Sequence, residues 1–205
     1  MRQILTGKAS DRTMDWTVLR GMFRLRHTVF YQRLRWDVKI TGDLERDEYD
    51  ELAPVYLVSR DHQRRVDGCL RLFPTTGSYM LKDTFPELLR GEAAPSDPHI
   101  WELSRFTVIP SSERDCGQAS LSNATLDVMR RLYEFGKEND IHSYVAVISV
   151  SLERLLRSIG LPLRRFGDGK AQRIGTVLSV ACWIPVNEES RQALYATLDE
   201  ERRAA

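Results

Sequence analysis

Apolar side chains recur at spacings of three and four residues along two long stretches of the chain. The first covers 15–34 and the second covers 120–139. This spacing gathers the apolar residues on one side of a helix, so two long amphipathic helices are predicted. Shorter helical segments are expected at 83–91, at 151–160 and, with mostly charged residues, at 188–203.

Between these helices lie short apolar runs, and these predict strands. The runs 54–59 and 66–74 are joined by the polar turn DHQRR and are expected to form a hairpin. Further strands are expected at 99–109, 141–150 and 173–185. The order of elements predicts an α/β (α+β) sandwich of helices around a mixed, largely antiparallel sheet. No linker interrupts it, so residues 1–205 are expected to form one domain.

The segment 35–52 is polar and acidic without a sustained period, which predicts a long loop. Loops of that length in compact domains are usually functional or disordered, and the tryptophan and tyrosine in this one favour order. Asp47 and Asp50 stand three residues apart in it. They fit either a solvated turn or a cation site, for which Phe30, Trp36 and Tyr49 would supply aromatic faces.

Composition narrows the classes of function. The 205 residues carry a formal net charge of +1, so no strong field points to nucleic acid or an anionic membrane. The first residues lack the apolar core of a signal peptide, and no apolar run is long enough to span a bilayer. The three cysteines are far apart, as expected for reduced thiols in a cytoplasmic protein. The four histidines are scattered without an HExxH motif, so we expect neither a metal site nor a cofactor.

Some polar residues stand where burial alone would not select them. Arg26 interrupts the apolar stripe of the first helix, and a guanidinium buried there needs a carboxylate or a ligand. Along the central predicted strand, a period of two places Glu102 and Ser104 on one face and Arg105 on the other, unless a β-bulge re-aims one of them. A structural ion pair of Glu102 with Arg71 or Arg26 and a catalytic role for Glu102 are both open at this point.

Basic residues gather between 154 and 173, where Asp168 is the one acidic residue. A solvated helix face explains such a cluster. The functional alternative is a docking surface for an acidic carrier protein or a phosphopantetheine arm.

Taken in order along the chain, these patterns resemble the acyl-homoserine-lactone synthase family of the LuxI type. The resemblance covers roughly 22–167 and is carried by the segments RHTVFYQRLRWDV, DEYD, GCLRLFPTTGSYMLKDTFPELL and PSDPHIWELSRF. It implies a fold like that of the GCN5-related N-acetyltransferases (GNAT), whose central strands splay apart to admit an acyl-pantetheine arm. It also implies S-adenosylmethionine as the amine-bearing substrate and, usually, an acyl-acyl carrier protein as the acyl donor. The products would be an acyl-homoserine lactone, a quorum-sensing signal, and methylthioadenosine.

The resemblance also implies roles for residues of this chain. The implied catalytic set is Glu102 as general base with Arg105, Ser104, Asp47, Asp50 and Arg71 around it. The implied S-adenosylmethionine contacts are Arg26, Phe30, Trp36, Asp47, Phe85 and Arg105. The acyl chain is expected to meet Leu126, Met129, Tyr144, Ala146, Ile148, Leu152, Leu155 and Leu156. Carrier docking is assigned to Arg154, Arg157, Arg164 and Arg165.

Family members that favour a 3-oxo acyl chain often carry a threonine where this sequence has Ile148, so a chain unsubstituted or hydroxylated at C3 is predicted. Ser149 is an alternative partner for a C3 oxygen. Three other functions compete with the carrier-dependent synthase. They are a synthase that uses acyl-coenzyme A, a GNAT-type N-acyltransferase acting on another small amine, and a non-catalytic module that binds an acyl chain or a carrier protein.

Overall fold

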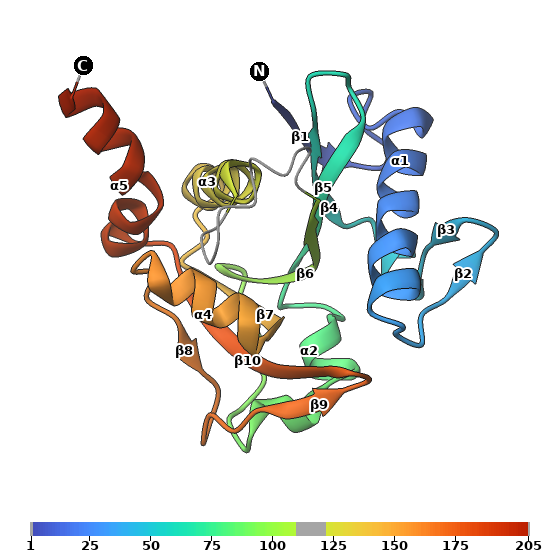
Figure 1. Cartoon of the computed structure of the whole chain (residues 1–205). Coiled ribbons are helices and arrows are strands. Elements are labelled where there is room, and N and C mark those ends of the chain that lie inside the picture. Colours follow the sequence, from blue (N-terminus) through green and yellow to red (C-terminus); the bar gives the residue numbers. More distant parts are fainter. Residues whose placement is uncertain (1, 110–121, 205) are drawn as a thin grey trace.

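The computed structural model describes residues 2–109 and 122–204, and within them eight strands form one sheet (Figure 1). The strand order is β1-β4-β5-β6-β7-β10-β8, with β9 beside β10. The bounds are Gln3–Lys8 for β1, Val55–Arg60 for β4, Val66–Pro74 for β5, Ile100–Val108 for β6, Ser143–Ser149 for β7, Arg164–Arg165 for β8, Gln172–Ile174 for β9 and Val177–Pro185 for β10. β6 and β7 run parallel and the other described pairs run antiparallel, which confirms the predicted sheet.

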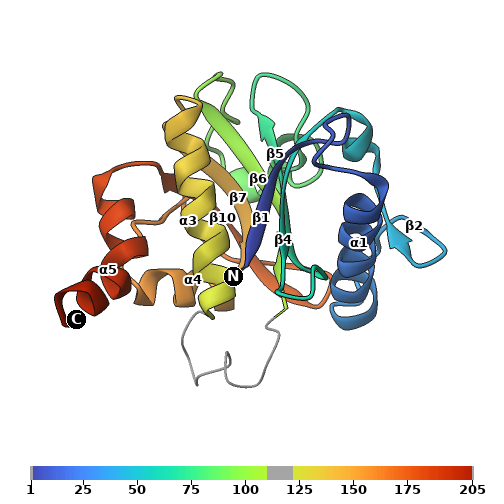
Figure 2. The same ribbon diagram turned by 90° about the horizontal axis from the view of Figure 1, so that it is seen from above.

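Helices cover both faces of this sheet (Figure 2). On one face, α1 (Trp16–Arg26) packs against β5 and continues as a π-helical stretch over His27–Arg33. The short α2 (Met80–Asp83) lies against β6 and β7. The other face carries α3 (Asn123–Glu138), α4 (Val150–Ser158) and α5 (Glu188–Ala204), with α5 packed on α3. Short 3₁₀ turns cover Glu48–Glu51 and Pro86–Leu89.

The structure adds elements that the sequence pattern did not predict. β1 is one of them, because its six residues mix apolar and polar types too evenly to stand out. It is held by antiparallel pairing of all six residues with β4. The predicted loop 35–52 is ordered and contains the small hairpin of β2 (Ile40–Thr41) and β3 (Leu44–Glu45).

Two predictions fall partly outside the described residues. The second long helix, expected from residue 120, is described from Asn123, so Leu121 lies outside. Of the cysteines, Cys69 and Cys182 are free and buried, and Cys116 lies outside the described ranges. No helix within 2–109 or 122–204 is long and apolar enough to cross a membrane.

Alternation along the strands divides the core between the two faces. Leu57 of β4 packs in the cluster beneath α3, whereas its neighbours Tyr56 and Val58 pack in the cluster beneath α1. In β7, Ala146 faces α3 and Val145 faces α2. This period of two is what a sheet covered on both faces requires.

The two central strands separate along their length. β6 and β7 pair from Ile100–Ser143 to Leu103–Ala146 and then part, although β6 continues to Val108 and β7 to Ser149. The splayed sheet centre is therefore confirmed. Beyond the pair Leu103–Ala146 the two strands are no longer hydrogen-bonded to each other. The gap between them leaves space inside the sheet for a ligand.

A β-bulge in β6 decides which side chains enter that space. Register with β5 shifts between the pairs Cys69–Thr107 and Arg71–Ser104, and Arg105 adopts a left-handed backbone with φ 53°. The extra residue reverses the alternation. Arg105 therefore joins the face that carries Glu102, and the exception allowed for in the sequence analysis is the arrangement found.

Candidate active site

One buried network joins arginines to carboxylates on the α1 face of the sheet. Arg26 donates to both carboxylate oxygens of Asp50, at 2.8 Å each, and also donates to Glu45. Arg71 donates to Asp47 and, at 2.9 Å, to Asp50. All five side chains are at most 8% exposed. Arg26 thus has the carboxylate partners that its place on an apolar stripe demanded.

Arg105 completes this network from the bulge in β6. It donates to Glu45 at 2.9 Å and to Asp47 at 2.7 Å. Its guanidinium lies 5.3 Å from the ring centre of Phe30, within cation–π range. With Arg105 the network holds three arginines and three carboxylates.

The 3₁₀ turn before β4 fixes the two aspartates relative to each other. Asp47 caps the turn, and its own backbone amide donates to Asp50 at 2.9 Å, a reciprocal capping box. Tyr56 donates its hydroxyl to Asp50 at 2.8 Å. Burial alone would raise the pKa of Asp50, but the hydrogen bonds and charge of Arg26, with the charge of Arg71, hold it well below its usual range.

Glu102 stands apart from this network. Its carboxylate oxygens accept hydrogen bonds from the backbone amides of Met80 at 3.0 Å and Leu81 at 2.6 Å, the first residues of α2. Burial raises the pKa of Glu102 to about 7, although the two amides and the charges of Arg71 and Arg105 act to lower it. The sequence left open an ion pair of Glu102 with Arg71 or Arg26. In the structure, the hydrogen-bond donors to Glu102 are these two backbone amides. A carboxyl with this pKa can exchange a proton near neutral pH.

Two adjoining cavities meet beside Glu102. The larger has a volume of about 630 Å³ and is lined by Glu102, Ser104 and residues of β7, α4 and β10. The smaller has a volume of about 450 Å³ and lies over the loop that carries Asp47. The residues that line both are Trp36, Met80, Phe85, Arg105 and Ile174.

An aromatic pair lines the larger cavity, and one member of it, Trp36, belongs to the shared wall. The rings of Phe30 and Trp36 stack with centroids 5.3 Å apart. Gly175 faces the indole closely, because a Cβ there would lie 3.3 Å from Trp36 Cδ1. The buried Nε1 of Trp36 has no hydrogen-bond partner among the described residues, so a ligand atom that accepts a hydrogen bond would satisfy it.

The residues predicted to act in catalysis and in S-adenosylmethionine binding fall into two groups. Those that line a cavity are Phe30, Trp36, Asp47, Phe85, Glu102, Ser104 and Arg105. Arg26, Asp50 and Arg71 lie behind the walls, with side chains at most 1% exposed. The second group braces the first, since its ion pairs fix Asp47 directly and Arg105 through Glu45 and Asp47.

The eight predicted acyl-chain residues divide between cavity wall and core. Ile148 and Leu152 line the larger cavity. The other six belong to the hydrophobic core on the α3 face, namely Leu126, Met129, Tyr144, Ala146, Leu155 and Leu156. Apolar wall residues that the sequence did not predict include Val29, Leu34, Val147, Val150, Val177 and Leu178.

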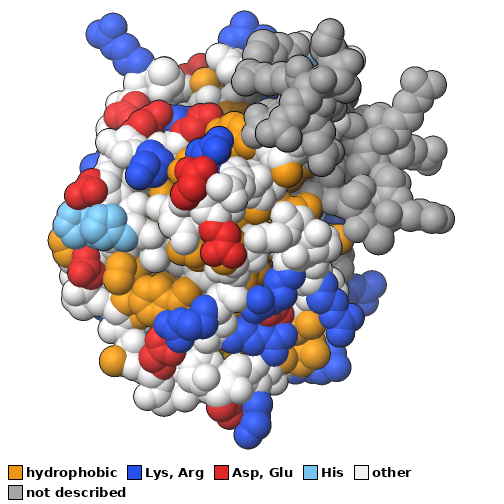
Figure 3. All heavy atoms as spheres, turned by 90° about the vertical axis from the view of Figure 1, so that its left-hand side faces the viewer, with side chains coloured by type: hydrophobic (Ala, Val, Ile, Leu, Met, Phe, Trp, Pro, Cys, Tyr) orange, Lys and Arg blue, Asp and Glu red, His pale blue; other side chains and the backbone are white. Residues whose placement is uncertain are grey.

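The predicted docking arginines lie around α4 and β8, on a side of the molecule where basic side chains gather (Figure 3). Arg154 lines the larger cavity. The other three pair with glutamates, as Arg157–Glu153, Arg165–Glu153 and Arg164–Glu92.

The sequence pattern did not predict two parts of the site. Glu45 is fully buried between Arg26 and Arg105. Its signal was its place two residues before Asp47, because alternate residues of an extended segment point the same way. The amides of α2 that hold Glu102 have no side-chain signature at all.

Comparison with known proteins agrees with this geometry. A family model described as autoinducer synthase matches residues 10–194. An acyl-homoserine-lactone synthase of Vibrio anguillarum is 42% identical over 86% of this chain and 90% of its own length. One from Pseudomonas aeruginosa is 40% identical over 93% of this chain and 94% of its own length.

Solved structures give the same result for the fold. The acyl-homoserine-lactone synthase LasI superposes with a TM-score of 0.85 at 38% identity, covering 96% of this chain and 95% of LasI. The coenzyme A-dependent synthase BjaI, solved with S-adenosylmethionine and isopentyl-coenzyme A, gives 0.83 at 27% identity, covering 97% and 90%. A putative N-acetyltransferase from Lactobacillus plantarum, 12% identical with a TM-score of 0.58 over 91% and 99%, shares the fold alone.

The GNAT-like fold and the acyltransferase activity expected from the sequence are therefore confirmed. The chain belongs to the autoinducer synthase family and is an acyl-homoserine-lactone synthase.

Proposed function

We propose that this synthase transfers a fatty acyl group from an acyl-acyl carrier protein to the α-amine of S-adenosylmethionine, with Glu102 as the general base. The observation that carries the proposal is a carboxyl with a pKa of about 7 beside the wall shared by two cavities. The lining of the smaller cavity includes several charged and aromatic side chains, and the lining of the larger one consists mainly of apolar side chains. That division suits two unlike substrates that meet at one base.

The smaller cavity is the proposed site of S-adenosylmethionine. Trp36 and Tyr49 offer aromatic faces for the adenine ring or the sulfonium, and Asp47 offers a carboxylate for the ammonium or the sulfonium. Arg105 lines this cavity and is suited to hold the substrate carboxylate.

Amide formation then follows by attack of the amine on the thioester. The nitrogen lone pair forms the C–N bond while the carbonyl electron pair moves onto oxygen, and Glu102 accepts the proton from nitrogen, directly or through one water. Backbone amides of β6 beyond Leu103, where β7 has parted, are the proposed donors to the oxyanion. Collapse of the intermediate breaks the C–S bond and releases the thiolate.

Lactone closure needs alignment rather than a base. The substrate carboxylate attacks its own γ-carbon and forms the C–O bond, while the C–S bond breaks and methylthioadenosine leaves with the electron pair. The protein contributes a held conformation in which carboxylate oxygen, carbon and sulfonium lie in line. Arg105, fixed by Glu45 and Asp47, is the proposed holder.

The pH dependence of kcat/KM for amide formation follows from the pKa of Glu102. The ionised carboxylate is the base, so activity is expected to fall about tenfold per pH unit as the pH drops below about 7. The initial rate of thiol release, measured between pH 5.5 and 8.5, tests this. The residual rate of the Glu102→Gln variant should not show this fall in rate below pH 7. A pH profile identical to that of the wild type would contradict the assignment of Glu102 as the general base.

The acyl substituent at C3 follows from the side chains of the larger cavity. Ile148 lines it and offers no hydrogen bond to a C3 oxygen. Ser149 also lines it, and its hydroxyl oxygen accepts a hydrogen bond from the Leu152 amide at the start of α4, while its O–H can still donate. From the side chain of Ile148, an unsubstituted acyl donor is expected to react faster than its 3-oxo counterpart. Ile148→Thr should shift the ratio of kcat/KM values toward the 3-oxo donor by roughly 3–10-fold, the worth of one hydrogen bond.

Ile148→Val is the matched control for that change, because valine has the shape of threonine without the hydroxyl. It should leave the donor preference unchanged. A wild-type enzyme that prefers the 3-oxo donor would refute the assignment of Ile148.

The preference for a carrier protein over coenzyme A is proposed from the arginines around α4. Arg154 stands at the larger cavity, and the neighbouring arginine–glutamate pairs leave a net positive surface. An acidic carrier protein complements such a surface. The buried free thiols of Cys69 and Cys182 support a reducing, cytoplasmic setting for the reaction.

The test is mass spectrometry of the organic extract after incubation with S-adenosylmethionine and matched acyl-carrier-protein and acyl-coenzyme A thioesters. Acyl-homoserine lactone should form with equimolar methylthioadenosine, and the carrier-protein thioesters should give the higher kcat/KM. Faster reaction of the coenzyme A thioesters would overturn the donor proposal. Thioester consumption with an amine other than S-adenosylmethionine would overturn the acceptor.

A further inference from the structure

The fold brings together two histidines that lie far apart in the sequence. His99 immediately precedes β6, and His142 immediately precedes β7. These strands run parallel in register from Ile100–Ser143, so the residues before them are neighbours. The two imidazole rings stack with centroids 4.7 Å apart and planes at 10°.

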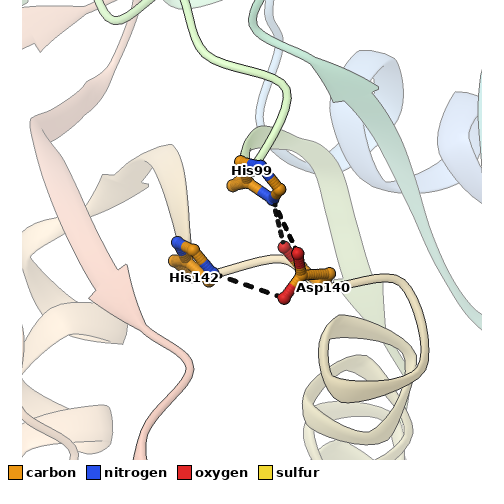
Figure 4. A group of neighbouring side chains, drawn as sticks. All are labelled: His99, Asp140 and His142. Atoms are coloured by element: carbon orange, nitrogen blue, oxygen red, sulfur yellow. Dashed lines mark hydrogen bonds and ion pairs between the residues drawn. The ribbon is translucent and has the colours of Figure 1, made fainter.

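Asp140 adds a carboxylate to this pair. Figure 4 shows its side chain beside the two stacked imidazoles, with His99 Nδ1 3.1 Å from one oxygen and His142 Nε2 3.4 Å from the other. One ligand atom from each residue can be chosen so that all lie within 4.8 Å of one another.

The main chain holds these three residues in place. The His142 amide donates to the His99 carbonyl at 2.8 Å, and the His99 amide donates to the Asp97 side chain at 2.7 Å. Asp140 has a left-handed backbone with φ 53°, and Ile141 after it is buried. The backbone positions are therefore fixed, which lowers the entropy cost of gathering the side chains around an ion.

We propose that His99, Asp140 and His142 form a binding site for a divalent transition metal ion such as Zn²⁺. Two imidazole nitrogens and one carboxylate oxygen form a common donor set for zinc, with water completing the coordination. A tetrahedral ion with Zn–N distances of about 2.0–2.1 Å needs its ligand atoms closer than they now stand. The side chains are 43%, 76% and 68% exposed, so they can rotate inward without disturbing the core.

Metal binding would replace hydrogen bonds that the three residues already make. His99 Nδ1 also lies 2.8 Å from the Asp140 carbonyl oxygen, and binding exchanges such exposed contacts for coordinate bonds. The site is distinct from the catalytic one, since Glu102 is held on the α2 side. An ion bound here would tie the starts of β6 and β7 together, at the end of the pair where the strands still touch.

The experiment uses the full chain without an affinity tag, stripped of metal by a chelator and titrated with ZnCl₂ by calorimetry. We expect one zinc ion per chain to bind with a dissociation constant in the micromolar range, together with a rise in Tm as zinc is added. His142→Ala and Asp140→Asn should each weaken binding at least tenfold. His62→Ala, which removes an exposed histidine elsewhere, should leave binding unchanged.

Absence of saturable binding below millimolar zinc would overturn the proposal. Binding of equal strength in His142→Ala would also overturn it, because the ion would then be held by other groups of the chain. The test does not depend on whether the metal-free protein makes acyl-homoserine lactone, because calorimetry and Tm report binding and not activity.

Discussion

Replacing Glu102 by glutamine is expected to lower kcat for amide formation by about 10²–10⁴-fold while the fold is retained. The amide matches the carboxylate in shape and its oxygen still accepts a hydrogen bond from one of the two α2 amides, but it cannot take a proton from the attacking amine. The rate of methylthioadenosine release measures the loss, and circular dichroism with a thermal melt measures the fold.

Glu87→Gln is a suitable control, because this glutamate is exposed and lies close in sequence to α2. It should keep wild-type turnover. Wild-type turnover in Glu102→Gln would reduce Glu102 to a structural anchor for the Met80–Asp83 turn. It would also favour a substrate amine that loses its proton to water.

The second large effect is expected on stability, at Arg26. Arg26→Met should lower the free energy of unfolding by about 3–5 kcal/mol, because it leaves the carboxylates of Glu45 and Asp50 buried without their partner. Urea denaturation followed by tryptophan fluorescence measures the change. The free energy of unfolding of Arg26→Lys should lie between those of the wild type and Arg26→Met. An ammonium keeps the charge but cannot bond both oxygens of Asp50 as the guanidinium does.

Arg24→Met is the matched control from the same helix. Arg24 also pairs with an aspartate, Asp43, but both side chains are 52% exposed. Its loss should leave the unfolding free energy essentially unchanged. A comparably small effect at Arg26 would mean that its carboxylates find other donors, and the bracing role assigned to Arg26 would be wrong.

The sequence predicted the parts of the site that break a local rule. Arg26 stood out because an apolar helix stripe should not carry a guanidinium, and Glu102 because a central strand should not carry a carboxylate. The pattern could not say that Arg26 faces carboxylates rather than substrate. That depends on Glu45, whose burial comes from packing between two elements distant in the chain.

Long-range pairing explains the other gaps between sequence and structure. The apolar residues of 120–156 were expected around the acyl chain, but strand alternation and helix packing place most of them in the core. The cavity wall contains some residues of β7 and α4, and it also takes residues from the π-helical stretch after α1 and from the start of β10. His99 and His142 are 43 residues apart in numbering, and parallel strand pairing alone brings them into contact.

The buried charges also bear on how substrate and protons are linked. Three arginines balance three carboxylates, and Glu102 stands outside that balance. S-adenosylmethionine carries one net positive charge, and a cation placed near Glu102 favours its ionised form. Binding near neutral pH therefore expels a proton from the protein, and affinity for this substrate rises with pH. The calorimetric heat of binding would then differ between buffers of unlike ionisation enthalpy. The pH would therefore act on the enzyme already at the substrate-binding step, before any covalent bond is made.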